Sequence, residues 1–237
     1  NGKAHGYSVG LLQPIYEGKT LKFTSDLTLD ALTAKSYVYK SQLYDKYNLR
    51  ALRFGLNGLK DDSYGRWISR VETHVGLPML GATTSQTKSG GSSKFFRINP
   101  SLVRLQALPY KTTGIVKVSA QFSSSELLGI EQFELGGMNS VRGFPEGTLY
   151  AHTGYFANVE LRRPIPCLPN YKYLPLKDRI ELAVFYDNGL GKVKGYKMKS
   201  RNFLQSVGAG LRIHLTEYLN ANLDLGFPIG GSVTDSK

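Results

Sequence analysis

Polar and apolar residues alternate strictly along several long stretches of this chain, and no other feature restricts its fold as much. In YLNANLDLGF one face carries Leu219, Ala221, Leu223, Leu225 and Phe227, and the other carries Asn220, Asn222 and Asp224. The stretches DRIELAVFYD and IVKVSAQF repeat the pattern. Because successive side chains of a β-strand point to opposite faces, this period of two predicts strands with one apolar and one polar side.

The same pattern predicts about ten strands and no amphipathic helix. They lie near residues 5–15, 20–31, 48–59, 64–77, 94–108, 113–124, 154–163, 178–188, 203–215 and 218–228. Most of them exceed the about five or six residues of a typical soluble strand and approach the about 9 to 11 that cross a bilayer. The 26 Gly, 15 Tyr and 11 Phe residues also favour strands joined by turns.

The connections between these strands indicate which face points inward. Short turns at EGKT, KDDS, LPYKTTG and LTEY alternate with long polar links near 32–47, 78–93, 125–153 and 189–202, and a Pro-rich turn near 164–177 is the exception. In an up-and-down sheet the long links then share one end, which is typical of outer-membrane barrels. Aromatic residues near strand ends suit a membrane interface, although sheet packing explains them equally well: Tyr7, Trp67, Tyr155, Tyr218 and Phe227.

We therefore predict an all-β chain that forms part of a transmembrane antiparallel up-and-down β-barrel. If the long links lie outside the cell, the first predicted strand starts and the tenth ends on the external side of the membrane. Whole barrels of this class normally have both termini in the periplasm. We expect a single, partial outer-membrane barrel domain over residues 1–237, without its first strands and its last strand. The tail GGSVTDSK then corresponds to an external loop.

Other classes of protein have little support in the sequence. The net charge of +12 would suit nucleic-acid binding, but the basic residues are scattered and no nucleic-acid module accompanies them. The one dense basic run fits a solvated loop or a contact with anionic lipid: Lys192, Lys194, Lys197, Lys199 and Arg201. No run reaches the about 20 apolar residues of a membrane helix, and the start of the chain lacks a signal-peptide core.

The sequence likewise gives no sign of a metal, a cofactor or a catalytic centre. Cys167 is the single cysteine and excludes a disulfide framework, and the histidines lack metal-ligand spacing: His5, His74, His152 and His214. No phosphate-binding loop is present. We predict no cofactor and no enzymatic activity. A soluble lipocalin-like binder or a barrel enzyme remains an alternative, which the need for detergent would distinguish.

The segment FELGGMNSVRGFPEGTL, within the longest link, is unusual between two clean strand patterns. Gly136, Gly137 and Gly143 permit backbone shapes closed to other residues, which suits a loop that folds back on itself. Arg142 at its centre needs acceptors if it leaves water. The polar lumen wall of a barrel would supply them.

This segment resembles the signature of the outer-membrane polypeptide-transporting barrel superfamily, which includes two-partner-secretion transporters and BamA-type insertases. The resemblance implies a sixteen-stranded barrel whose long external loop enters the lumen with a latch motif at its tip, here Val141, Arg142, Gly143 and Phe144. The family's partner motif, Phe-x-Asp on a lumen-facing strand, matches Phe185 and Asp187, and alternation independently puts both on the polar face. The resemblance thus pairs Arg142 with Asp187.

Within the superfamily, the cues EQF, TGY and ELR around the loop are more similar to two-partner-secretion transporters of the FhaC/ShlB type. This implies a monomeric pore in the outer membrane of a Gram-negative bacterium, in contact with lipid and lipopolysaccharide, that passes an unfolded secreted partner protein and binds no nucleic acid. The alternative is a BamA-type insertase that assembles other barrels. The chain departs from the family pattern because it lacks the periplasmic docking domains and the final strand.

Overall fold

The computed structural model of the chain describes residues 2–38, 42–87, 90–166, 179–192, 201–214 and 219–232. The long strands are β1 (Gly2–Glu17), β2 (Leu21–Val38), β3 (Gln42–Asp62), β4 (Gly65–Gly76), β5 (Phe96–Leu108), β6 (Thr112–Ser123), β9 (Thr153–Pro164), β10 (Ile180–Lys192), β11 (Arg201–His214) and β12 (Asn220–Ser232). Each overlaps one of the strands that alternation predicts. Among the described residues, no helix is long and apolar enough to cross a membrane.

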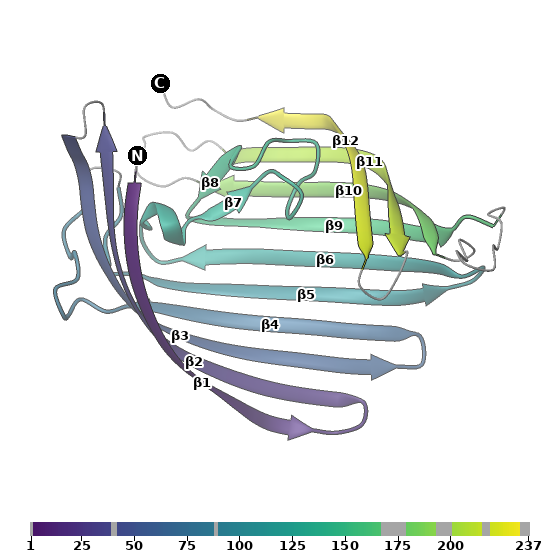
Figure 1. The fold of residues 1–237 in the computed structure, drawn as a ribbon, viewed down its shortest axis with the longest axis horizontal. Coiled ribbons are helices and arrows are strands. Elements are labelled where there is room, and N and C mark those ends of the chain that lie inside the picture. Colours follow the sequence, from purple (N-terminus) through teal and green to yellow (C-terminus); the bar gives the residue numbers. More distant parts are fainter. Residues whose placement is uncertain are drawn as a thin grey trace.

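These strands form a single 10-stranded sheet in which every strand pairs with the next one along the chain. All the pairings are antiparallel. The sheet is strongly curved and open, with β1 and β12 at its edges (Figure 1). It has the architecture of an up-and-down barrel wall, so the predicted fold class is confirmed.

The two faces of the sheet differ in polarity in the way a membrane barrel requires. On the outer face of β12, Leu223, Leu225 and Phe227 are 59%, 70% and 61% exposed. On the inner face, Glu160 and Asp187 are buried. A soluble sheet buries its apolar face instead, whereas a membrane barrel turns that face to lipid and encloses a polar lumen.

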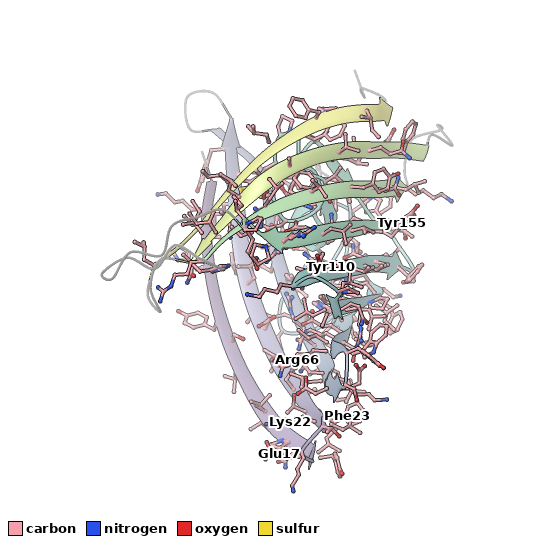
Figure 2. The ribbon with its side chains drawn as sticks, turned by 90° about the vertical axis from the view of Figure 1, so that its right-hand side faces the viewer. Glu17, Lys22, Phe23, Arg66, Tyr110 and Tyr155 are labelled. Atoms are coloured by element: carbon pink, nitrogen blue, oxygen red, sulfur yellow. The ribbon has the colours of Figure 1, made fainter. Side chains whose placement is uncertain are left out.

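The short connections gather at one end of the sheet (Figure 1). There Glu17 of β1 lies opposite Lys22 of β2, beside the turn that joins the two strands (Figure 2). Near the next such turn, the Arg104 guanidinium lies 4.9 Å from the centroid of the Trp67 ring and donates to Asp62 at 2.6 Å. An aromatic ring and a cation at a strand end are the groups expected at a membrane interface.

The long link predicted near residues 32–47 is wrong, because strand continues through most of it. β2 runs to Val38, β3 starts at Gln42, and the ladder pairs Ala34 with Tyr47. Leu32 and Tyr47 pack against a buried cluster that consists of Leu49, Ala51, Phe95, Leu127 and Leu128. This part of the hairpin is therefore covered by Phe95 from the β4–β5 link and by Leu127 and Leu128 from the β6–β9 link, a tertiary contact that alternation does not show.

The longest link, predicted as irregular over residues 125–153, also contains regular structure. It holds a 3-10 helix, η2 (Gly129–Glu131), and two short strands, β7 (Phe133–Leu135) and β8 (Leu149–Ala151), which pair with each other. Strands this short cannot show a period of two. Several other predicted features lie outside the described residues: Cys167, Tyr218, Lys194, Lys197, Lys199, and most of the links near 164–177 and 189–202.

Candidate functional site

The connection between β6 and β9 folds back across the inner face of the sheet (Figure 1). We call residues 124–152 the lumen loop. Its apolar side chains form one buried cluster with the barrel wall: Phe133, Leu135, Val141 and Leu149 from the loop, Phe156 from β9 and Leu204 from β11. Burial of this apolar surface favours the docked position of the loop over a solvated one.

Two adjacent glycines turn the end of β7 into the tip of the lumen loop. Gly136 and Gly137 have φ angles of +108° and +83°, a region that only glycine adopts readily. A Cβ atom on Gly136 would also lie 2.3 Å from the carbonyl oxygen of Pro145. The hydroxyl of Ser140 accepts from the Gly136 N–H at 2.9 Å and donates to its carbonyl at 2.8 Å. The predicted role of these glycines in shaping the loop thus has a steric basis.

Arg142, at the tip, lies against acidic residues of the lumen wall. Its backbone N–H and its Nε donate to Oδ2 of Asp187 at 3.0 and 2.8 Å, and its Nη2 donates to Oδ1 at 2.8 Å. Its Nη1 donates to Oε2 of Glu160 at 2.5 Å. The structure therefore brings Arg142 and Asp187 together in a bidentate, charge-assisted contact, with Asp187 fully buried.

The aromatic residue of the Phe-x-Asp motif covers the same guanidinium. The Cζ atom of Arg142 lies 3.4 Å from the centroid of the Phe185 ring. Phe185 in turn occupies the space above Gly208, where a Cβ atom would lie 2.3 Å from the ring. A desolvated cation over an aromatic face is attracted to the negative side of the ring. Phe185 and Asp187 therefore bind the same group from two sides.

A wider network of alternating charges surrounds this contact. Oε1 of Glu160 accepts from Nε of Arg162 at 2.6 Å and from Nη2 of Arg212 at 2.9 Å. Nη1 of Arg212 donates to Oδ1 of Asp224 at 2.7 Å, and the other oxygen of Asp224 lies 3.7 Å from Nη1 of Arg142. Each buried charge has an opposite charge beside it, which offsets the cost of taking it out of water.

These contacts fix the protonation state of the arginine. Burial alone would lower the pKa of the Arg142 guanidinium, but its hydrogen bonds to Asp187 and Glu160 raise the pKa above its ordinary value. Arg142 therefore stays charged throughout the range of pH in which proteins fold.

The remaining latch residues place the tip on the wall by close packing. Val141 is fully buried, and a Cβ atom on Gly189 of β10 would lie 2.9 Å from its Cγ2. A Cβ atom on Gly143 would lie 2.8 Å from the carbonyl carbon of Gly226 in β12. Phe144 is partly buried against the apolar cluster of the loop. The backbones of the tip and of β12 thus meet at a point where neither has a side chain.

The sequence also matches the model of a known family. The haemolysin secretion/activation protein ShlB/FhaC/HecB family model covers residues 1–213 of the 237. The chain belongs to this family. The resemblance inferred from the loop motif is thereby confirmed, whereas a sequence search of curated proteins finds no match.

Solved structures show the same fold as this ShlB/FhaC/HecB family member. CdiB from Escherichia coli superposes with a TM-score of 0.82 at 21% identity, over 98% of this chain and 42% of that one. CdiB from Acinetobacter baumannii gives 0.72 at 15% identity, over 97% and 39%. BamA from Haemophilus ducreyi, in a structure lacking POTRA domains 1–3, gives 0.68 at 17% identity, over 96% and 51%. The chain thus spans about half the length of these structures or less.

Sequence reasoning missed part of the site in this family member. The sequence patterns assigned Asp224 only to a polar face and did not join Glu160 to Arg142. The signal lies in the register, since Glu160 stands directly opposite Phe185 in the β9–β10 ladder. Within the described residues, no group of His, Cys, Asp and Glu side chains could hold a metal ion.

Proposed function

We propose that this chain is the barrel domain of an outer-membrane pore that passes a partner polypeptide across the outer membrane, with the lumen loop as its gate or internal brace. The proposal places it in the outer membrane of a Gram-negative bacterium, as a monomeric barrel in contact with lipid and lipopolysaccharide. Its partner would be a secreted protein that is unfolded during passage. Membership in the haemolysin secretion/activation family supports this class of function.

The observation that carries the proposal is the position of Arg142. A flexible external loop would keep its arginine in water, yet this side chain is 9% exposed and is bound by Asp187 and Glu160 on the inner wall. The loop therefore occupies lumen space that a passing polypeptide needs or touches. An ion pair of this kind can hold the loop in one position while leaving a second position accessible when the contacts break.

A BamA-type insertase, which assembles other barrels, is the second candidate. It is favoured by the likeness to BamA from Haemophilus ducreyi, although the likeness to CdiB from Escherichia coli has the higher TM-score. Family membership favours secretion. The two candidates predict different defects when the protein is inactivated. A secretion pore would lose export of its one partner, whereas an insertase would lose assembly of many barrels.

The test uses Arg142→Ala and Asp187→Ala in the protein expressed from its full gene. We expect each variant to lower the amount of secreted partner in the medium severalfold, because the tip loses its fixed position, while the barrel still assembles. Assembly is checked by the mobility of unheated protein on a denaturing gel. Arg66→Ala is the matched control, since it removes an exposed bidentate contact with Asp61 at the opposite end of the sheet.

Normal export by both lumen variants would contradict the proposed role of the loop. Normal export combined with depletion of other outer-membrane barrels would instead support the insertase. The partner to be assayed is a polypeptide that is absent from the medium when the gene for this protein is deleted.

A further inference from the structure

The lumen loop has a second charged contact with the wall, at its base. Glu131, the last residue of η2, comes before the β7–β8 hairpin, whereas Arg142 lies at the tip beyond it. The Glu131 side chain is 1% exposed, so it is buried as deeply as the acids that bind Arg142. Glu131 is the first residue of the EQF cue, which assigned it no role, and the contacts of Arg142 at the tip do not involve it.

The carboxylate of Glu131 lies among cations of the wall. Its Oε2 is 2.6 Å from Nη2 of Arg97 and 3.6 Å from Nδ1 of His74, and its Oε1 accepts from Nη2 of Arg53 at 3.0 Å. The backbone carbonyl of Glu131 accepts from the side-chain amide of Gln121 at 3.1 Å. A buried carboxylate without such partners is strongly disfavoured, and the arginines beside it need a negative charge in turn, so this position favours an acid.

The wall residues at the base come mostly from strands on the other side of the sheet from the acids that bind Arg142; only β6 contacts both parts of the described loop, because Lys117 also donates to the Asn139 carbonyl at 3.1 Å. Arg53, His74, Arg97 and Gln121 stand on β3, β4, β5 and β6 in turn. The acids that bind Arg142 stand on β9, β10 and β12. The loop thus connects the first part of the sheet to the second. The signs are reversed between the contacts, because an acid on the loop meets basic residues at the base and a base on the loop meets acids at the tip.

We propose that Glu131 is a positioning residue that fixes the base of the lumen loop against β3–β6 and so keeps Arg142 within reach of Asp187 and Glu160. The significance of this for export rests on the proposed function, but the positioning itself can be measured separately. Without the Glu131 side chain, the base keeps the apolar packing of Leu127 and Leu128 but loses its charged contact with the wall, whereas the charged contact of Arg142 still fixes the tip. Loss of Glu131 would also leave Arg97 without its nearest carboxylate, which favours displacement of the base.

The test measures distances between spin labels in the protein expressed from its full gene, with Cys167 replaced by serine. One label reports the base at Ile130, which is 56% exposed, and another reports the tip at Met138, which is 63% exposed. Each is measured in turn against a label at Tyr64, which is 69% exposed, in the β3–β4 turn. Glu131→Gln should at least double the width of the base distribution.

Three further variants test whether the broadening comes from loss of the Glu131 charge or from a general change in the loop. Glu134→Gln removes an exposed charge from the same loop and should leave both distributions unchanged. Glu131→Asp keeps the carboxylate and should restore part of the narrow distribution. Arg142→Ala should broaden the tip distribution more than the base distribution. This pattern is specific to a charged contact at the base. A general loosening of the loop would instead broaden the base and tip distance distributions in every variant.

An unchanged base distribution in Glu131→Gln would overturn the proposal. If that variant fails to assemble, Arg97→Lys is measured instead, and it should broaden the base distribution because the shortest contact of Glu131 is lost. An unchanged distribution there would equally overturn it. If the base broadens as expected but every variant, including Arg142→Ala, exports its partner normally, the positioning role stands and the proposed transport role fails.

Discussion

Replacing Asp187 by asparagine removes the charge of the latch acceptor and almost none of its volume. Asp187 is fully buried and its two oxygens accept from the backbone N–H, Nε and Nη2 of Arg142. The asparagine amide keeps one acceptor and places an NH₂ group where the other oxygen was. A donor of Arg142 then faces a donor, so a buried hydrogen bond is lost and the cation keeps less compensating charge.

The size of the effect follows from the contacts that remain. Breaking a buried ion pair by removing one partner costs about 3 to 5 kcal/mol. Arg142 retains Glu160 at 2.5 Å, so the lower end of that range applies, about 3 kcal/mol. Since about 1.4 kcal/mol corresponds to a tenfold change, the released tip should become roughly 100-fold more populated.

Hydrogen exchange measures this population directly, because the Arg142 amide donates to Asp187 and exchanges when the tip leaves the wall. In Asp187→Asn, peptides that cover residues 136–148 should exchange roughly 100-fold faster, with β9 and β10 unchanged. Arg66→Ala, which removes an exposed arginine contact, should leave all of these peptides as they are. If exchange at the tip is the same in Asp187→Asn and the parent protein, the acceptor contributes nothing to docking and the latch interpretation is wrong.

Two further predictions concern the close backbone contact between Gly143 and Gly226 at the tip of the lumen loop and the pH dependence of the Glu131 contacts at its base. Gly226→Ala should speed amide exchange at the tip, because its Cβ would lie 2.6 Å from the Gly143 nitrogen. Gly129→Ala is the control and should leave exchange at the tip unchanged, since no atom lies within 4 Å of its Cβ. Equal exchange rates in the two variants would contradict the steric argument. Burial raises the pKa of Glu131, but the nearby His74 side chain and the charges of Arg97 and Arg53 hold it below its usual 4.5. Because the folded pKa is lowered, the stabilisation is complete above about pH 4.5 and is lost as pH falls through the folded value. The spin label at the base should therefore broaden only below about pH 4.5, and broadening already at neutral pH would contradict this.

Most of the sheet could be predicted because local pattern and tertiary environment agree there. Along β10 from Ile180 to Tyr186 and along β12 from Ala221 to Phe227, every second residue is apolar and lies on the outer face, so these strands are visible in the sequence alone. The end of β2 was missed because side chains of the long links pack against its inner face, so apolar residues occur there on the face that is polar elsewhere. Leu32 and Tyr47 pack under external loops instead of facing lipid.

In the candidate site, too, some contacts could be predicted from the sequence and others depend on the tertiary structure. Arg142 and Asp187 were paired through the resemblance to a family motif and a face assignment, and the structure brings them together. Glu160 was not joined to Arg142, because that contact depends on the register between β9 and β10. Glu131 was part of the EQF cue but had no assigned partner, since its partners lie on β3, β4 and β5, far away in the sequence.

The sequence by itself determined most of the long strands, the polarity of the two faces and the glycine-rich loop that carries Arg142, because each depends on the order of residues within a short stretch. Only the tertiary structure decided where the loop is held. An ion pair such as Glu131 with Arg97 depends on which distant side chains the folded sheet brings within reach, and on burial that removes competing water. Neither the proximity of these side chains nor their burial exists before the strands have paired.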